Sequence, residues 1–310
     1  MRSPIQWLGG KSLMVTKWRK YVTIPHTTYV EVFGGGGSML FGKDPEGIVE
    51  VYNDLDGRLV NFFRVLRDPD LFAVFQRRVE SAPLAKLDYA TAACLCRCPA
   101  ADQVTQAAAF FTLARQSFGG MAGKAWGTAV ASLAAGQART VAEWMNVINR
   151  LPEVSARLRR VQIDNADFRQ VINHYDRPET LFYLDPPYVA STRRGGGYEC
   201  ELTDDDHRNL LSMIKHAQGM VMISGYPSAL YDKTLARWRC DKYETKVMTQ
   251  GCTKTQNNKG KGGMQDKRYD RIEAVWFNPK MARRLKTAGI HRDCAPERSA
   301  CSDDCQRTSA

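Results

Sequence analysis

One stretch decides the fold: residues 181–188, which read LFYLDPPY. Four apolar residues lead into an acid, two prolines and an aromatic ring. A short apolar run that ends at proline predicts a buried strand of an α/β sheet. Ligands in such sheets bind outside the carboxyl ends of the strands, so we expect Asp185 to lie at the rim of a cleft.

The turn after this strand has the residue types that methyl transfer to an exocyclic amine needs. The carboxylate of Asp185 can accept one N–H of the amine, and the carbonyl of Pro186 can accept the other. Proline has no N–H of its own and stiffens the turn, while Tyr188 offers a ring on which a base can stack. We therefore predict that Asp185, Pro186 and Tyr188 are catalytic; the alternative is an ordinary proline-rich turn.

A second informative segment lies near the start of the chain. Residues 29–33 predict a short strand, the four glycines at 34–37 a tight turn, and Ser38 the start of a helix. Glycine allows a ligand to approach the backbone closely, although four glycines can also form a linker. Residues 48–53 predict another strand that ends at Asp54, where an acid commonly binds ribose hydroxyls; a solvated Asp is the alternative.

These segments together resemble the Dam-type family of DNA adenine N6-methyltransferases, in the alpha group where the cofactor loop precedes the catalytic tetrapeptide. The matching motifs are PIQWLGGK at 4–11, FGGGGS at 33–38, NADF at 165–168 and DPPY at 185–188. The resemblance extends to about residue 279 and implies S-adenosylmethionine as cofactor. The cofactor-binding residues that it implies are Trp7, Lys11, Phe33, Gly35, Gly37, Ser38, Asp54, Asp167, Phe168 and Asp185.

The expected fold class is α/β, a Rossmann-like S-adenosylmethionine-dependent methyltransferase fold with an inserted helical target-recognition subdomain. After Asp54 the apolar residues follow helical spacing at 58–66, 70–80, 103–114 and 140–151. Strand patterns return at 161–163, 219–224 and 274–277. We predict a catalytic domain formed by residues 1–57 and 158–279, an inserted helical subdomain at 58–157, and a disordered basic tail at 280–310.

Three segments have the composition of DNA contacts. Residues 115–127, RQSFGGMAGKAWG, combine glycines with basic and aromatic side chains, and the resemblance implies a target-recognition hairpin there. Such a segment can enter a groove and read base edges, but it can also be a plain helix connection. Residues 189–198 could contact phosphate near a flipped base. Residues 251–271 predict a basic loop near the sheet edge, with a solvated run of charges as the alternative. The predicted DNA-binding residues are Arg115, Gln116, Lys124, Arg193, Arg194, Lys259 and Lys261.

Charge and length agree with a polyanionic partner, which we predict is double-stranded DNA. The 310 residues carry a formal charge of +11, of which the last 31 contribute +3. An apolar stretch of about twenty residues is missing, and so is a charged-then-apolar leader. We therefore expect no membrane association and a cytoplasmic protein, bacterial or phage-encoded, that is associated with the nucleoid through DNA.

Cysteines and acids do not predict a metal site. The chain has nine cysteines, which we expect to be reduced thiols, and the spacing of Cys94, Cys96 and Cys98 is not that of a zinc site. Residues 203–206, TDDD, are typical of a helix N-terminus. Methyl transfer from a sulfonium needs no metal.

Two other classes of function stay open. Aspartate in the tetrapeptide favours adenine, but a methyltransferase of RNA, cytosine N4 or protein glutamine has related chemistry. A DNA-binding module with a degenerate cofactor pocket is the non-enzymatic alternative. Loss of Lys11, Asp54 or Asp185 would have supported it, but all three are present. Gln6 stands where relatives often carry a basic residue, so the target GATC does not transfer directly. A partner restriction nuclease would be separately encoded.

Overall fold

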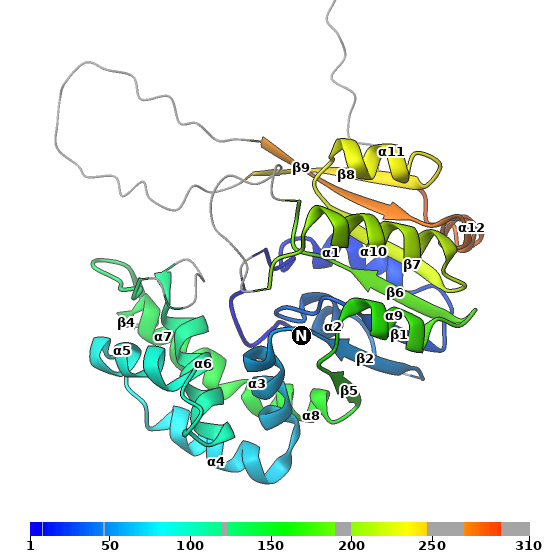
Figure 1. Ribbon diagram of the computed structural model, residues 1–310. Coiled ribbons are helices and arrows are strands. Elements are labelled where there is room, and N and C mark those ends of the chain that lie inside the picture. Colours follow the sequence, from blue (N-terminus) through cyan, green and yellow to red (C-terminus); the bar gives the residue numbers. More distant parts are fainter. Residues whose placement is uncertain are drawn as a thin grey trace, which may run out of the picture.

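A mixed sheet with helices on both faces forms the centre of the molecule (Figure 1). Within the described residues of the computed structural model, seven strands form this sheet in the order β5-β2-β1-β6-β7-β9-β8. The described residues are 1–7, 9–45, 47–118, 123, 125–189, 200–246 and 270–292.

The sheet is mostly parallel. Strands β5, β2, β1, β6 and β7 run in one direction, β9 is antiparallel to β7, and β8 is antiparallel to β9. The strand bounds are β1 Thr28–Glu31, β2 Val49–Asn53, β5 Val161–Asp164, β6 Thr180–Leu184, β7 Met220–Gly225, β8 Arg239–Lys246 and β9 Asp270–Phe277.

The stretch that opened the sequence analysis forms the central strand β6, which is buried along its whole length. Successive side chains of a strand point to opposite faces. Leu181 and Tyr183 accordingly join one apolar cluster, whereas Phe182 and Leu184 join the other. The apolar run is continuous because both faces of this strand are covered.

Different helices cover the two faces. The first cluster includes apolar side chains from helices near both ends of the described chain: α1 Val15–Trp18, η1 Arg19–Val22, α2 Ser38–Gly42 and α12 Pro279–Thr287. The second includes side chains from α9 Phe168–Tyr175, α10 Asp204–His216 and α11 Ala229–Thr234. The result is a three-layer mixed α/β arrangement, as the strand and helix patterns predict.

Helices also fill the long segment between β2 and β5, at the lower left of Figure 1. Phe62 and Phe111 stack there with ring centroids 5.7 Å apart, and Phe111 lies 5.1 Å from Trp144. These rings belong to the same apolar cluster as the first face of the sheet, so the helices share a core with it. The elements are α3 Gly57–Arg67, α4 Pro69–Glu80, α5 Lys86–Leu95, α6 Gln103–Gln116, β3 Leu133–Ala134, β4 Gln137–Ala138, α7 Arg139–Asn149 and α8 Leu151–Leu158.

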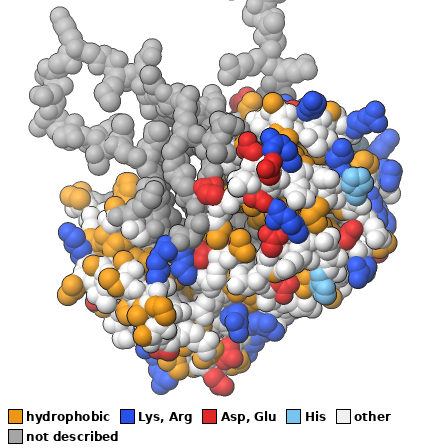
Figure 2. Space-filling model, in the orientation of Figure 1, with side chains coloured by type: hydrophobic (Ala, Val, Ile, Leu, Met, Phe, Trp, Pro, Cys, Tyr) orange, Lys and Arg blue, Asp and Glu red, His pale blue; other side chains and the backbone are white. Residues whose placement is uncertain are grey.

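The prediction of disorder from residue 280 is wrong for its first part. Asn278 caps helix α12 by accepting a hydrogen bond from the Met281 backbone N–H at 2.9 Å, and Pro279 occupies the first turn. Met281 and Leu285, four residues apart, are fully buried. Lys and Arg side chains line the edge of the molecule where α12 lies (Figure 2). The many charges there form the outer face of a helix; residues 293–310 lie outside the described residues.

Candidate active site

A cavity lies where the strand order reverses. From β1 the chain proceeds outward to β2 and β5 on one side, whereas β6 and β7 lie on the other. Parallel sheets bind ligands at such a switch point, outside the carboxyl ends of the strands. The empty space there is about 940 Å³, including the part open to solvent.

The structure brings most of the predicted cofactor residues together around this cavity. The predicted residues that line it are Trp7, Lys11, Phe33, Gly35, Ser38, Asp54, Asp167, Phe168 and Asp185. Gly37 is not part of the lining. Of the predicted catalytic turn, Asp185 and its neighbour Pro187 line the cavity, while Pro186 and Tyr188 are buried beside it.

The glycine loop leaves no space for side chains. A Cβ on Gly34 would lie 2.1 Å from the Tyr52 ring, and one on Gly35 would lie 2.8 Å from the Trp7 ring. Gly35 also has a φ of +49°, a conformation that favours glycine. The loop backbone therefore forms the cavity wall directly, with Trp7 packed over it.

Gly37 has a structural place instead. It adopts the left-handed conformation, with φ 67°, at the N-cap of α2, and a Cβ there would lie 3.0 Å from the Phe41 ring. Ser38, the next residue, lines the cavity. The expected contact of Gly37 with the cofactor is not what this geometry favours, because its backbone is used to start the helix.

Asp54 holds the loop in place. Its Oδ2 accepts a hydrogen bond from the Gly35 N–H at 2.8 Å, and its Oδ1 accepts one from the Asp56 N–H at 2.9 Å. Burial raises the pKa of the Asp54 carboxyl to about 6, although both backbone donors work in the opposite direction. The carboxylate is thus preoriented at the cavity edge.

Two aromatic rings form the far end of the cavity. Phe33 and Phe168 lie with ring centroids 5.7 Å apart, and both line the cavity. Asn53 fixes the segment that carries Phe168: its side chain donates to the Ala166 carbonyl at 3.1 Å and accepts from the Ala166 N–H at 2.9 Å. The end of β2 therefore determines where the Asp167–Phe168 turn lies.

Asp185 is held at both carboxylate oxygens. Lys11 Nζ lies 2.8 Å from Oδ2, and the Ser224 hydroxyl donates to Oδ1 at 2.9 Å. Ser224 stands in β7, the neighbouring strand, and is fully buried. The carboxylate at the end of β6 is therefore fixed by residues from the N-terminal segment and from the adjacent strand.

Tyr188 is packed rather than open to solvent. Its hydroxyl donates a hydrogen bond to Glu273 in β9, its ring lies 4.4 Å from the Tyr226 ring, and Lys11 Nζ lies 4.7 Å from its ring centroid. Lys11 Nζ also lies 3.7 Å from Glu273. Burial is the main reason that the pKa of Glu273 is raised; nearby Lys11 lowers it and Asp185 raises it.

A further buried acid stands beneath the site. Glu31 ends β1, lines the cavity, and accepts a hydrogen bond from the Leu40 N–H at 3.0 Å. Burial raises its pKa to about 8, so this side chain is largely neutral at pH 7.

The sequence interpretation missed Glu31, Ser224 and Glu273. Glu31 and Ser224 lie in strands that were read for their apolar pattern, and Glu273 precedes the predicted strand at 274–277. A polar residue that breaks an otherwise buried strand is the signal that could have found Glu31 and Ser224, since buried polar groups need partners. Nothing local marks Glu273, because β9 places it beside Tyr188 only through long-range pairing.

The donor set around the cavity fits S-adenosylmethionine. A cation at Lys11 suits a carboxylate, an acid at Asp54 suits ribose hydroxyls, and the rings of Phe33 and Phe168 suit a purine. The bare backbone of the glycine loop lets a ligand approach closely. The residues present therefore match the three chemical parts of that molecule.

The predicted recognition segment begins as a small antiparallel ladder. Ser117 and Trp126 form a bridge, the Phe118 N–H donates to the Ala125 carbonyl at 2.6 Å, and the Gly127 N–H donates to the Gln116 carbonyl at 2.7 Å. Phe118 is exposed at its end. This pairing of two short arms is hairpin-like.

The predicted DNA-binding residues have different environments. Arg115 is partly buried, and burial lowers its pKa. Gln116 is only 3 % exposed and accepts a hydrogen bond from the Trp126 ring N–H at 3.4 Å, so it supports the ladder instead of facing a groove. The other five fall outside the described residues: Lys124, Arg193, Arg194, Lys259 and Lys261.

The described residues show no group of three or more His, Cys, Asp or Glu side chains that could hold a metal ion. Cys94 is exposed, Cys96 buried and Cys98 intermediate. Thr203 and Asp206 form the predicted helix start as a reciprocal capping box of α10. Among the described residues, none of the helices is long and apolar enough to cross a membrane.

Comparison with known proteins decides the family. The sequence model of the D12 class N6 adenine-specific DNA methyltransferases matches residues 7–243, which include the glycine loop, Asp54 and the catalytic turn. The chain belongs to this family. It is therefore an adenine-specific DNA methyltransferase, an enzyme that methylates adenine N6 in DNA.

One curated relative is the Type II methyltransferase M.CviBI of Paramecium bursaria Chlorella virus NC1A. It is 24% identical over 217 residues, which cover 69% of this chain and 79% of that protein. The family match and this relative agree with the resemblance that the sequence motifs carry.

Proposed function

We propose that S-adenosylmethionine binds in the cavity between the ends of β1 and β6. Lys11 would pair with its methionine carboxylate, Asp54 would accept hydrogen bonds from its ribose, and Phe33 and Phe168 would pack on its adenine. The observation that carries this proposal is one cavity lined by a cation, an acid and two rings at the switch point of the sheet. A bound S-adenosylmethionine would supply the methyl group from its sulfonium.

The target adenine would enter beside Asp185. Its N6 is a weak nucleophile because the lone pair is delocalised into the ring, and acceptors on the two N–H groups would aim that pair at the methyl group. Oδ2 of Asp185 and the carbonyl of Pro186 would be these acceptors, with Ser224 holding Oδ1 at 2.9 Å. Lys11 now occupies Oδ2, so its ammonium must pass to the cofactor carboxylate before the amine can bind.

The substrate in this proposal is double-stranded DNA with the adenine flipped out of the duplex. Residues 115–127, with Arg115 and the exposed Phe118, would contact bases, and the helices between β2 and β5 would form the inserted target-recognition subdomain. Residues 1–57 and 158–279 would form the catalytic domain. The enzyme would act in the cytoplasm on a bacterial or phage chromosome, alone or beside a separately encoded restriction nuclease.

The test is a comparison of nucleic acids methylated in cells that express the full chain. Sequencing that detects modified bases should find N6-methyladenine in DNA within one short sequence, and cells expressing Asp185→Ala should lack it. The inactive variant controls for host methylation. Detection of N4-methylcytosine alone, or of label only in RNA or protein, would contradict the proposal.

A further inference from the structure

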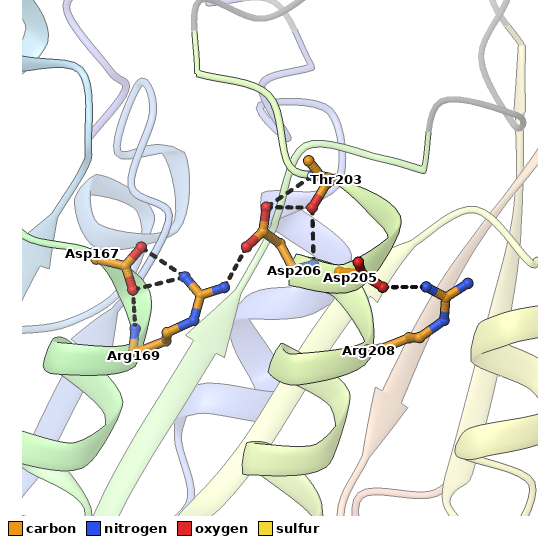
Figure 3. A network of polar contacts seen from close by, with 6 residues as sticks. All are labelled: Asp167, Arg169, Thr203, Asp205, Asp206 and Arg208. Carbon is orange, nitrogen blue, oxygen red and sulfur yellow. Dashed lines mark hydrogen bonds and ion pairs between the residues drawn. The ribbon is translucent and has the colours of Figure 1, made fainter.

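Arg169 lies at the start of α9 and contacts acids on two different elements (Figure 3). Its Nη1 lies 3.0 Å and 3.2 Å from the two carboxylate oxygens of Asp167, and its Nη2 donates to Asp206 in α10. The Arg169 backbone N–H also donates to Asp167 at 2.8 Å. The guanidinium carbon lies 4.3 Å from the centroid of the Phe168 ring.

Asp206 is itself fixed by the cap of α10. It accepts hydrogen bonds from the Thr203 N–H at 3.0 Å and the Thr203 hydroxyl at 2.7 Å. Leu202, the residue before this cap, lines the same cavity as Asp167 and Phe168. Arg169 therefore joins two walls of one end of the cavity, one from the start of α9 and one from the start of α10.

The arrangement is more than a single surface ion pair. An isolated exposed pair contributes little, but one arginine here bridges two carboxylates and covers an aromatic ring. Its side chain is 36% exposed, that of Asp167 37% and that of Asp206 26%. Bonds from Thr203 and then Arg169 lower the pKa of Asp206 to about 2. Arg169 is thus held between two carboxylates and over the Phe168 ring.

We propose that Arg169 is a positioning residue that makes the cavity selective for a 6-aminopurine. It would orient the Asp167 carboxylate toward the exocyclic amine of the cofactor adenine. A carboxylate accepts hydrogen bonds and repels another acceptor. A purine that carries an oxygen in place of the amine should therefore gain nothing from Arg169. The inference rests on the proposed cofactor site.

The experiment is calorimetric titration of the full chain with S-adenosylhomocysteine and with S-inosylhomocysteine, its 6-oxo counterpart. Arg169→Ala should weaken S-adenosylhomocysteine about tenfold and change S-inosylhomocysteine less than twofold. In methylation assays it should raise KM for S-adenosylmethionine by a similar factor, while kcat at saturation stays within twofold. The lysine of Arg169→Lys cannot bridge both acids, so this variant should bind S-adenosylhomocysteine about threefold more weakly.

Arg208→Ala is the matched control. Arg208 pairs with Asp205 at 2.5 Å on the same helix end, but both side chains are exposed, at 60% and 90%, and lie apart from Asp167 in Figure 3. This variant should bind both ligands as the parent does. In an Asp167→Ala background, Arg169→Ala should add less than a further twofold loss, because Arg169 acts through Asp167.

Three results for Arg169→Ala would each overturn the inference. They are an equal loss of affinity for the two ligands, a fall in kcat with unchanged KM, and unchanged binding. A thermal melt checks that folding is intact, and Arg169→Lys provides a second, milder variant if the alanine variant melts early. A parent protein that binds neither ligand would overturn the cofactor site itself, and the role of Arg169 with it. Binding by the parent with no effect of Arg169 would leave the cofactor site standing.

Discussion

Asp185 is fixed before any ligand arrives. Its two oxygens already have partners in Lys11 and Ser224, so the carboxylate cannot rotate freely at the end of β6. A group held in its working orientation lowers the barrier without being reorganised during the reaction. In this chain the Asp185 carboxylate is thus oriented by contacts from outside the tetrapeptide.

We expect Asp185→Ala to lower the methylation rate by about a hundredfold to a thousandfold or more, because the preoriented acceptor is removed. Folding should persist, since Asp185 ends a strand and is not part of the apolar core. The measurement is transfer of labelled methyl groups to duplex DNA, with a thermal melt in parallel. Asp185→Asn keeps one acceptor oxygen and serves as the milder comparison; full activity in the alanine variant would disprove the role.

Tyr188 should show separate effects of ring and hydroxyl. Tyr188→Ala removes the stacking surface and should weaken DNA binding by about 1–3 kcal/mol. Tyr188→Phe should keep most activity but lower the free energy of unfolding by about 1–3 kcal/mol, because buried Glu273 is left without this donor. Binding assays and denaturant titrations measure the two effects. Tyr175→Phe, which removes a hydroxyl 2.9 Å from Asp164, is the control remote from the site.

The raised pKa of Asp54 predicts a pH dependence for cofactor binding. Ribose hydroxyls bind the ionised carboxylate better, so binding should lower this pKa from its free value of about 6. Affinity should be constant above pH 6 and fall as the pH drops below it, by at most about tenfold per pH unit. Calorimetry with S-adenosylhomocysteine measures this dependence. Asp54→Asn should bind more weakly and with a flat profile; a parent profile that is flat from pH 5 to 8 would contradict the assignment.

At the scale of elements, the spacing of apolar residues predicted helices with one buried face and strands made of a continuous apolar run. It failed at β8, where Asp241 is buried against Tyr21 and Arg239 instead of an apolar side chain. The helix predicted at 140–151 covers α7 and stops at the first residue of α8, whose first turn contains Pro152. Local sequence cannot reveal such polar burial, because Tyr21, which donates a hydrogen bond to Asp241, comes from the other end of the chain.

Most of the residues that line the cavity could be named from the sequence, whereas the residues that support them could not. The glycine loop, Asp54 and Asp185 occur in contiguous motifs, so their residue types already indicate the chemistry. Ser224 and Glu273 contribute through strand pairing, which sets register only once the sheet has formed. The DNA contact of Gln116 stays a prediction; in the structure this side chain is buried and accepts a hydrogen bond from Trp126.

The ladder at residues 116–118 and 125–127 leads to the prediction for the recognition element. Replacing residues 115–127 with the corresponding segment of a relative that has another target should change the methylated sequence. The rate on that new target should stay within about tenfold, because Asp185 and the cavity lie on other elements. Modified-base sequencing of cellular DNA gives the answer. If the chimaera methylates the original sequence, recognition resides elsewhere.

At the scale of the whole molecule, the effect of a positive charge on DNA binding should depend on where that charge lies. Lys259→Ala with Lys261→Ala should weaken binding to all DNA sequences alike and lower the salt dependence of log Kd by about 0.9 for each phosphate that is no longer neutralised. The control pair is Arg283→Ala with Lys286→Ala in α12, which follows β9 at the opposite edge of the sheet from the cavity. Titrations over a range of salt concentrations measure both. Equal effects of the two pairs would mean that only total charge matters.

The contacts among Lys11, Asp185 and Glu273 join segments that are synthesised at different times. A ribosome delivers Lys11 first and Asp185 second, and Glu273 emerges only with β9, which must pair with β7 before its side chain reaches Tyr188. Until then the catalytic turn lacks one of its supports. The Tyr188 hydroxyl therefore gains its Glu273 partner only after the last strand has been synthesised and has paired with β7.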